Sequence, residues 1–166
     1  MHWRQGGFTL VELVVVLLVI AACVTVVFPK FSNGLLDQQR LRNSVSKIAS
    51  VAEYAYERAV SARLIHRLNI DIERGTYEVT AHTADGKFAP IGDDLRLAGR
   101  LPEDIHFSGV EFPNRRTSSE KSVTIEFNPQ GWIEPATIYV VSLEGRKMGI
   151  VMDDVLGSVA TFEVFE

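Results

Sequence analysis

The stretch Gly6-Gly7-Phe8-Thr9-Leu10-Val11-Glu12-Leu13 opens an apolar segment that continues to Phe28-Pro29. The 21 residues from Phe8 to Phe28 carry one formal charge, that of Glu12. Because an α-helix rises about 1.5 Å per residue, a helix of this length spans roughly 30 Å, which is the thickness of the hydrocarbon core of a bilayer. Residues 8–29 are therefore predicted to form one membrane-spanning helix.

A short polar stretch, residues 1–7, precedes the apolar segment. A secretory signal peptide has its small residues and cleavage site after the apolar run. Here the small residues Gly6 and Gly7 come before it. Cleavage between Gly7 and Phe8 would remove residues 1–7 as a leader and keep the helix on the mature chain. Glu12 would then lie close to the new amino terminus, and a carboxylate within a membrane span is energetically costly and usually functional.

The hexapeptide Gly7-Phe8-Thr9-Leu10-Val11-Glu12 resembles the class III signal of type IV pilins and of type II secretion pseudopilins. The resemblance implies that a prepilin peptidase cuts after Gly7 and methylates the new terminus at Phe8. It also implies that Glu12 is the intramembrane carboxylate used in assembly and that Pro29 kinks the helix. A plain signal anchor with a chance Gly-Phe-Thr is the alternative interpretation.

Charge and cysteine content constrain the remainder of the 166-residue chain. Of the 17 Lys and Arg, Arg4 and Lys30 fall within residues 1–30, and of the 21 Asp and Glu only Glu12 does, so residues 31–166 are net acidic. A net acidic surface argues against general nucleic-acid binding, which depends on neutralising phosphates. The one cysteine, Cys23, lies in the apolar segment. The outer domain therefore has no disulfide and must be stabilised by packing.

The location of the chain follows from the resemblance, because Arg4 and Lys30 give almost no positive-inside bias. The pilin-like family keeps its leader in the cytoplasm. The implied location is thus the bacterial inner membrane, crossed once, with the carboxy-terminal head in the periplasm of a Gram-negative cell. After extraction from the membrane, the subunit would enter a pseudopilus.

Residues 30–65 are predicted to be the amphipathic second half of one helix that runs from about residue 9 to residue 64. Pro29 lacks a backbone N–H, and Ser32-Asn33-Gly34 follows it, so we expect a kink or a weakened turn there. Beyond it, apolar residues recur at alternating spacings of three and four. This stripe is expected to pack on the protein's own sheet rather than to form a coiled-coil seam. Its members are Leu41, Val45, Ile48, Ala52, Ala55 and Ala59.

Residues 66–166 change to the alternating pattern of β-strands and are predicted to form an antiparallel head. Turns are expected at Arg74-Gly75, Asp85-Gly86, Asn128-Pro129-Gln130-Gly131 and Glu144-Gly145. The stretch Ala89–Leu101 is expected to be irregular. A polar loop over Gly109–Ser122 is long for a compact domain, and we interpret it as either a partner surface or a mobile solvated loop. Strands are expected after His66 (Leu68–Ile72), at Tyr77–Thr80, Ile105–Phe107, Val123–Phe127, Ala136–Leu143, Gly149–Met152 and Val159–Phe165.

The predicted fold class is α+β and pilin-like, with one long helix laid on an antiparallel β-sheet or β-sandwich head. Phe127-Asn128-Pro129-Gln130-Gly131 between strands, and Gly149-Ile150-Val151 followed by Gly157-Ser158-Val159, look like the carboxy-terminal pattern of the H-type minor pseudopilins, general secretion pathway protein H. The major pseudopilin is a poorer match. Its calcium loop has no counterpart beyond Asp93-Asp94 and Asp153-Asp154, which are interpreted as solvated turn residues.

Catalytic chemistry has little support in the sequence. The histidines His2, His66, His82 and His106 form no metal-binding spacing, and neither a nucleophile motif nor a phosphate loop occurs. His106, between Ile105 and Phe107, is expected on the exposed face of a strand. The chain is therefore interpreted as a structural protein without catalytic residues, cofactor or metal site.

The resemblance implies a minor pseudopilin of the type II secretion system, which assembles near the pseudopilus tip and helps to export folded proteins across the outer membrane. Its partners would be prepilin peptidase, the major pseudopilin, the minor pseudopilins of the I, J and K types, and inner-membrane lipid, with no nucleic acid. A minor type IV pilin serving adhesion or DNA uptake is the alternative within the family. A membrane-anchored periplasmic binding module is the alternative outside it.

Overall fold

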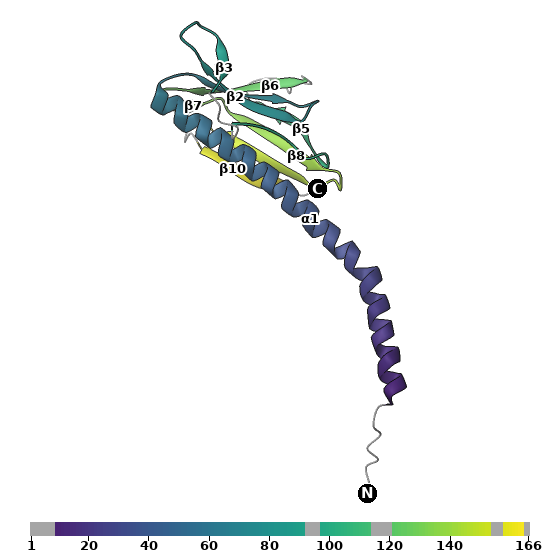
Figure 1. Ribbon diagram of the computed structural model, residues 1–166. Coiled ribbons are helices and arrows are strands. Elements are labelled where there is room, and N and C mark those ends of the chain that lie inside the picture. The colour runs from purple at the N-terminus through teal and green to yellow at the C-terminus, as the bar shows by residue number, and fades with distance from the viewer. Residues whose placement is uncertain (1–8, 92–96, 114–120, 154–157, 165–166) are drawn as a thin grey trace. The chain divides into compact units, whose positions relative to one another are not determined.

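The computed structural model describes residues 9–91, 97–113, 121–153 and 158–164, with the backbone alone for residues 26–34. The chain has two compact units, Met1–Asp37 and Gln38–Glu166. One helix, α1 (Leu10–Ala62), enters both units and is followed by strands (Figure 1). The strands are β1 (His66–Asp71), β2 (Thr76–His82), β3 (Phe88–Pro90), β4 (Ala98–Arg100), β5 (Ile105–Glu111), β6 (Ser122–Asn128), β7 (Trp132–Ile133), β8 (Ala136–Ser142), β9 (Lys147–Asp153) and β10 (Ser158–Val164).

Helix α1 has 53 residues and is continuous in the backbone through Pro29. The side chain of Pro29 lies outside the described residues, so the kink remains a prediction. In the second unit the predicted apolar stripe is confirmed, because each of its six members is at most 1% exposed. Ala49 and Val51 beside it are also buried, which widens the packed surface of the helix.

The helix ends at Ala62, close to the predicted end, through a left-handed residue. Arg63 has a φ angle of 56°, and the Leu64 amide donates to the Ala59 carbonyl at 3.3 Å. A left-handed residue of this kind commonly terminates a helix by satisfying one of its last carbonyl groups. His66 then begins β1, so the chain reverses from helix to sheet within a few residues.

The first sheet has the order β3-β2-β1-β6-β7, with β4 also paired to β2. The hairpin β1–β2 turns at Arg74-Gly75, as predicted: the Arg74 amide donates to Asp71 Oδ1 at 2.8 Å, and Gly75 has a φ angle of 64°. That left-handed conformation favours glycine. β1 lies between β2 and β6, antiparallel to both.

The second sheet has the order β10-β9-β8-β5, with every neighbouring pair antiparallel. Its register shifts by one residue between Phe107 and Gly109, which is a β-bulge in β5. The β8–β9 turn falls at the predicted Glu144-Gly145, where the Gly145 amide donates to the Ser142 carbonyl at 3.0 Å.

Two predictions about the strands need correction, and one short strand was missed. The stretch Ala89–Leu101 is not wholly irregular, because β3 and β4 both pair with β2. The loop predicted over Gly109–Ser122 is shorter, since β5 continues to Glu111 and β6 begins at Ser122; residues 114–120 lie outside the described residues. The short strand β7 was not anticipated. The continuation of β5 was missed because Gly109 ends the apolar alternation in the sequence, whereas the bulge restores it and buries Val110.

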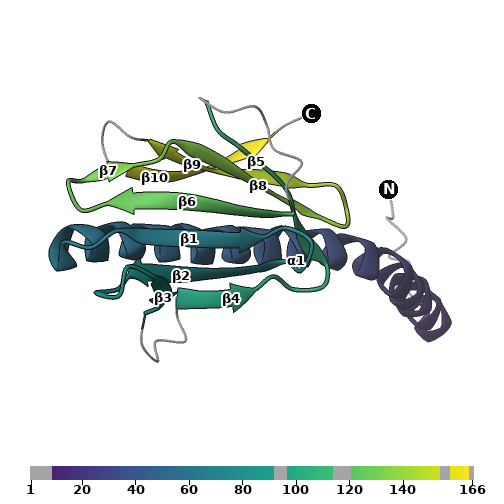
Figure 2. The ribbon, with the colours of Figure 1, turned by 90° about the horizontal axis from the view of Figure 1, so that it is seen from above.

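One hydrophobic core joins helix α1 to both sheets. In Figure 2 the second half of the helix runs along β1 and β6. The buried apolar side chains of these two strands belong to the same core as those of the helix. Alternate residues of the central strands β1, β6 and β8 point into this core, whereas their neighbours are only partly buried or exposed. The predicted fold class, α+β with a long N-terminal helix on antiparallel β-structure, is confirmed.

Candidate functional site

The amino-terminal end of α1 is built around Thr9. Its hydroxyl oxygen accepts a hydrogen bond from the Glu12 backbone amide at 3.3 Å, and its carbonyl accepts one from the Leu13 amide at 3.2 Å. Thr9 is therefore the N-cap of the helix, and Glu12 is in the first turn, where the helix dipole favours a negative charge. The spacing Thr-x-x-Glu is that of a capping box, a signal that the sequence interpretation did not use.

The first half of α1 is apolar on every side. Its large side chains are about half exposed or more in this unit, and Glu12 is the one charged residue from Leu10 to Thr25. A helix that is hydrophobic all round normally lies in a membrane or is enclosed by other helices. The exposed side chains include Leu10, Val11, Leu13, Val14, Val15, Val16, Leu17, Leu18, Val19, Ile20 and Val24.

The structure describes only some of the residues predicted to be functional in this region. Gly7 and Phe8 lie outside the described residues, so cleavage and methylation there remain predictions. The predicted span 8–29 also includes residues 26–29, whose side chains are not described. Within the residues that are described, no helical stretch is both long enough and apolar enough to qualify as a membrane span.

Polar contacts tie the start of the helix in the second unit to the β-structure. Arg40 pairs with Asp104 at 2.9 Å, and Arg42 pairs with Glu163 of β10 at 2.8 Å. The Arg40 guanidinium lowers the pKa of the Asp104 carboxyl by its hydrogen bond and, to a smaller degree, by its charge. Both arginines are more than half exposed, so each pair contributes at most about 1 kcal/mol and mainly fixes orientation.

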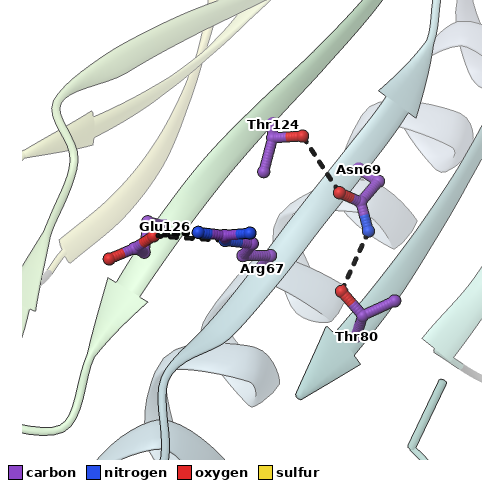
Figure 3. Close-up of polar contacts among 5 residues, drawn as sticks. All are labelled: Arg67, Asn69, Thr80, Thr124 and Glu126. Atoms are coloured by element: carbon purple, nitrogen blue, oxygen red, sulfur yellow. Dashed lines mark hydrogen bonds and ion pairs between the residues drawn. The ribbon is translucent and has the colours of Figure 1, made fainter. Parts of the chain in front are cut away.

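The outer face of the first sheet carries a polar network (Figure 3). Asn69 of β1 donates through Nδ2 to Thr80 Oγ1 on β2 and accepts through Oδ1 from Thr124 Oγ1 on β6, both at 3.0 Å. Beside it, Arg67 donates to Glu126 Oε2 from Nε at 3.2 Å and from Nη2 at 3.0 Å. These side chains satisfy one another across three strands, so the network fixes strand register.

The three histidines among the described residues have different environments. His66 is buried and bonds through Nδ1 to the Leu64 carbonyl at 2.9 Å, whereas His82 meets the Phe88 ring edge-on. His106 is exposed on β5, as predicted. In the described part of the chain, no three His, Cys, Asp or Glu side chains converge on a possible metal position.

The outer face of the second sheet is aromatic. Phe162 of β10 lies across Gly149 of β9, where a Cβ atom would overlap the ring, and it meets Tyr139 of β8 edge-to-face at 6.4 Å. The Lys147 ammonium lies 4.3 Å from the centre of the Tyr139 ring. Burial, and then the neighbouring Glu111 carboxylate, raise the pKa of the Tyr139 hydroxyl. The sequence interpretation placed these strands but missed this surface, which depends on cross-strand register.

Comparisons with known proteins support the pilin-like interpretation from two directions. Residues 4–28 match the prokaryotic N-terminal methylation motif. The fold is similar to that of the minor pseudopilin EpsH from the type 2 secretion system of Vibrio cholerae, at a TM-score of 0.62 and 13% identity, over 76% of this chain and 99% of that one. A crystal structure of the same pseudopilin is similar at a TM-score of 0.61 and 12% identity, over 77% of this chain and 96% of that one.

The solution structure of GspH from E. coli is also similar, with a TM-score of 0.57 and 11% identity over 75% of this chain and 89% of that one. No curated protein matches the chain by sequence. At these identities the structural matches establish the fold, and the motif adds independent support at the amino terminus.

Proposed function

We propose that this chain is an H-type minor pseudopilin, a structural subunit of a type II secretion pseudopilus. The observation that carries the proposal is a methylation motif at residues 4–28 joined to a head with the fold of EpsH and GspH. Helix α1 has the two surfaces that such a subunit needs. Its first half is apolar all round, and its second half buries one stripe against the head.

Processing is the first step of the proposed function. A prepilin peptidase cuts between Gly7 and Phe8 and methylates Phe8, which leaves the inner-membrane helix on the mature subunit. A glycine at the cleaved position lets an extended backbone approach the protease closely, and a branched side chain there would obstruct it. In peptidase-positive cells Gly7→Val should therefore accumulate a form that keeps residues 1–7, whereas Gly6→Ala should be processed. Mass spectrometry of the intact amino terminus measures both, and a wild-type chain that still begins at Met1 would refute the proposal.

Assembly is the second step, and Glu12 is its proposed charge. A carboxylate at the centre of a membrane helix costs on the order of 2.5–3.5 kcal/mol, and less near the interface. The new amino group at Phe8, on its own chain or on a neighbouring subunit, is the cation that offsets this cost. Pairing with a neighbouring subunit stabilises one axial register of docking. The apolar side chains cannot select a register in this way, because lipid solvates them as well as a neighbouring helix does.

The test of Glu12 has to separate charge pairing from helix capping. Glu12→Leu should leave cleavage intact and reduce the fraction of the subunit found in sheared pili relative to the membrane pool, and Glu12→Asp should be milder. Thr9→Ala is the matched control, because it removes the cap found here and keeps the carboxylate. Equal loss in Thr9→Ala and Glu12→Leu would assign the effect to the helix start instead of the charge.

In this proposal the head lies in the periplasm and contacts the major pseudopilin and the I, J and K minor subunits near the tip. Pili sheared from cells with the cognate secretion genes should contain the chain, and secretion of folded proteins should fall when it is deleted. A defect in adhesion or DNA uptake with normal secretion would instead favour a minor type IV pilin. Retention of the leader in those cells would favour a membrane-anchored binding module.

A further inference from the structure

The first turns of helix α1 in the second unit are packed on the β-structure less completely than the rest of the helix. Residues 38–44, about two helical turns, contain one buried side chain, that of Leu41. Residues 45–59 contain seven, which are Val45, Ile48, Ala49, Val51, Ala52, Ala55 and Ala59. Because burial of apolar surface is the main force that holds a helix on a sheet, packing alone holds residues 38–44 weakly.

The contact of Leu41 with the second sheet is also incomplete. A groove of about 240 Å³ lies there, lined by Gln38 and Leu41 of the helix and by Met148 of β9 and Val164 of β10, among others. Atoms that border an open groove lack contacts on that side, so they gain less dispersion energy than atoms in a closed core. The groove therefore weakens the hold of the second sheet on these two turns.

Polar contacts supply the remaining hold on residues 38–44. The ion pairs of Arg40 and Arg42 reach the connection between β4 and β5 and strand β10, respectively. Gln38 Oε1 accepts a hydrogen bond from Arg146 Nη1, just ahead of β9, at 3.3 Å. Ion pairs between exposed groups are individually weak and are screened by salt. The segment thus depends on interactions that break more readily than the core beyond it.

We propose that residues 38–44 form an ionic clasp, a segment that leaves the β-structure while the rest of the head stays folded. In the closed state Leu41 is buried and the two arginines keep their carboxylate partners. In the open state these contacts break, and the helix stays packed from Val45 onward. Local openings start where few apolar contacts and exposed polar contacts hold an element. The clasp therefore sets how much of α1 the head covers.

The use of the clasp rests on the proposed function, because a pseudopilin subunit docks on its neighbours through α1. Opening adds Leu41 and about two helical turns to the surface that a neighbouring subunit can contact. The opening itself requires neither cleavage of the leader nor a partner. It can therefore be measured on the purified chain, independently of assembly.

The first experiment compares two parts of α1 in the unchanged, full-length chain in detergent. Hydrogen exchange, measured by mass spectrometry, follows the amides of residues 38–44 and of residues 48–59. Two helical turns that leave the head lose protection, because a short helix is marginal in water. We expect residues 38–44 to exchange at least about tenfold faster than residues 48–59. Equal rates would show that the segment opens only with the whole head, and would overturn the proposal.

The second experiment tests whether an ion pair holds the segment closed. Every variant carries Leu41→Cys in a Cys23→Ser background, so the one thiol is at the side chain that opening exposes. Arg42→Glu places two carboxylates together and should speed thiol labelling by about fivefold. Adding Glu163→Arg restores a pair of opposite charges and should return the rate to its starting value. Arg58→Gln, at an exposed arginine of the same helix outside these ion pairs, is the matched control and should leave the rate unchanged.

Unchanged labelling in Arg42→Glu would overturn the clasp, as would an equal acceleration in Arg58→Gln. An acceleration that Glu163→Arg does not reverse would assign the effect to the helix rather than to the ion pair, and would also overturn it. Hydrogen exchange on the unchanged chain keeps the test valid if Leu41→Cys itself loosens the segment. Leader cleavage and pilus incorporation are measured separately in cells, so failure of the clasp would leave the proposed function standing.

Discussion

The contact of Phe162 with Gly149 allows a sharp test of the second sheet. A Cβ atom at Gly149 would overlap the Phe162 ring, while the backbone at Gly149 has no positive φ angle and would accept alanine without strain. In the wild-type background Gly149→Ala must displace the ring, and overpacking of this kind costs about 1–3 kcal/mol. In a Phe162→Ala background the same change has room, and alanine should stabilise the strand by roughly 0.5–1 kcal/mol over glycine.

The double-mutant cycle of Gly149→Ala and Phe162→Ala therefore predicts that Gly149→Ala changes from destabilising to stabilising when the Phe162 ring is removed. The coupling energy is about 1.5–4 kcal/mol if the two effects are taken at their full ranges. Urea unfolding of the four full-length proteins, followed by far-ultraviolet circular dichroism in detergent, measures it. The same loss of stability for Gly149→Ala with and without Phe162 would refute the packing argument.

Replacing Ile48 by alanine should lower the free energy of unfolding by about 2–5 kcal/mol, because its side chain is fully buried between α1 and the sheets. Lys47→Ala, on the exposed side of the helix, should change it by no more than about 0.5 kcal/mol. Urea unfolding compares the two variants, and equal effects would contradict the assigned helix face. The lowered pKa of Asp104 means that its pair with Arg40 stabilises the fold above the ordinary carboxyl pKa and is lost as the pH falls through the lowered value. Asp104→Asn should therefore reduce the drop in melting temperature between about pH 6 and about pH 3, and an unchanged drop would show that this pair contributes nothing.

The helix and the central strands were predictable because their patterns are local. The stripe from Leu41 to Ala59 repeats with the helical period, and Leu68 and Ile70 alternate with polar neighbours. Both patterns record which side of an element faces the core, and the core is where the structure places these residues. Turns such as Arg74-Gly75 were predictable for a similar reason, because a left-handed residue restricts the choice of side chain.

Other features depended on residues that are distant in sequence. β3 and β4 exist because β2 offers them an edge, and neither has enough apolar alternation to be recognised alone. The ion pair between Arg42 and Glu163 joins positions that are 121 residues apart in the sequence. At the candidate site, the role of Glu12 in the first helical turn could have been inferred from Thr9 three residues earlier, whereas the contact of Phe162 with Gly149 required the register of β9 and β10.

The order of strands in the two sheets has a consequence for synthesis. β6 pairs with β1 across more than fifty residues, and β5, which belongs to the other sheet, is made between them. The first sheet therefore cannot close before β6 and β7 have emerged from the ribosome, and the second sheet cannot close before β10 has, so part of the apolar stripe of α1 stays uncovered during that time. Non-local pairing of this kind slows folding and prolongs exposure of apolar surface. Positions 52, 55 and 59 of the stripe are alanines, and their small side chains limit the apolar surface that stays exposed until the sheets pack on the helix.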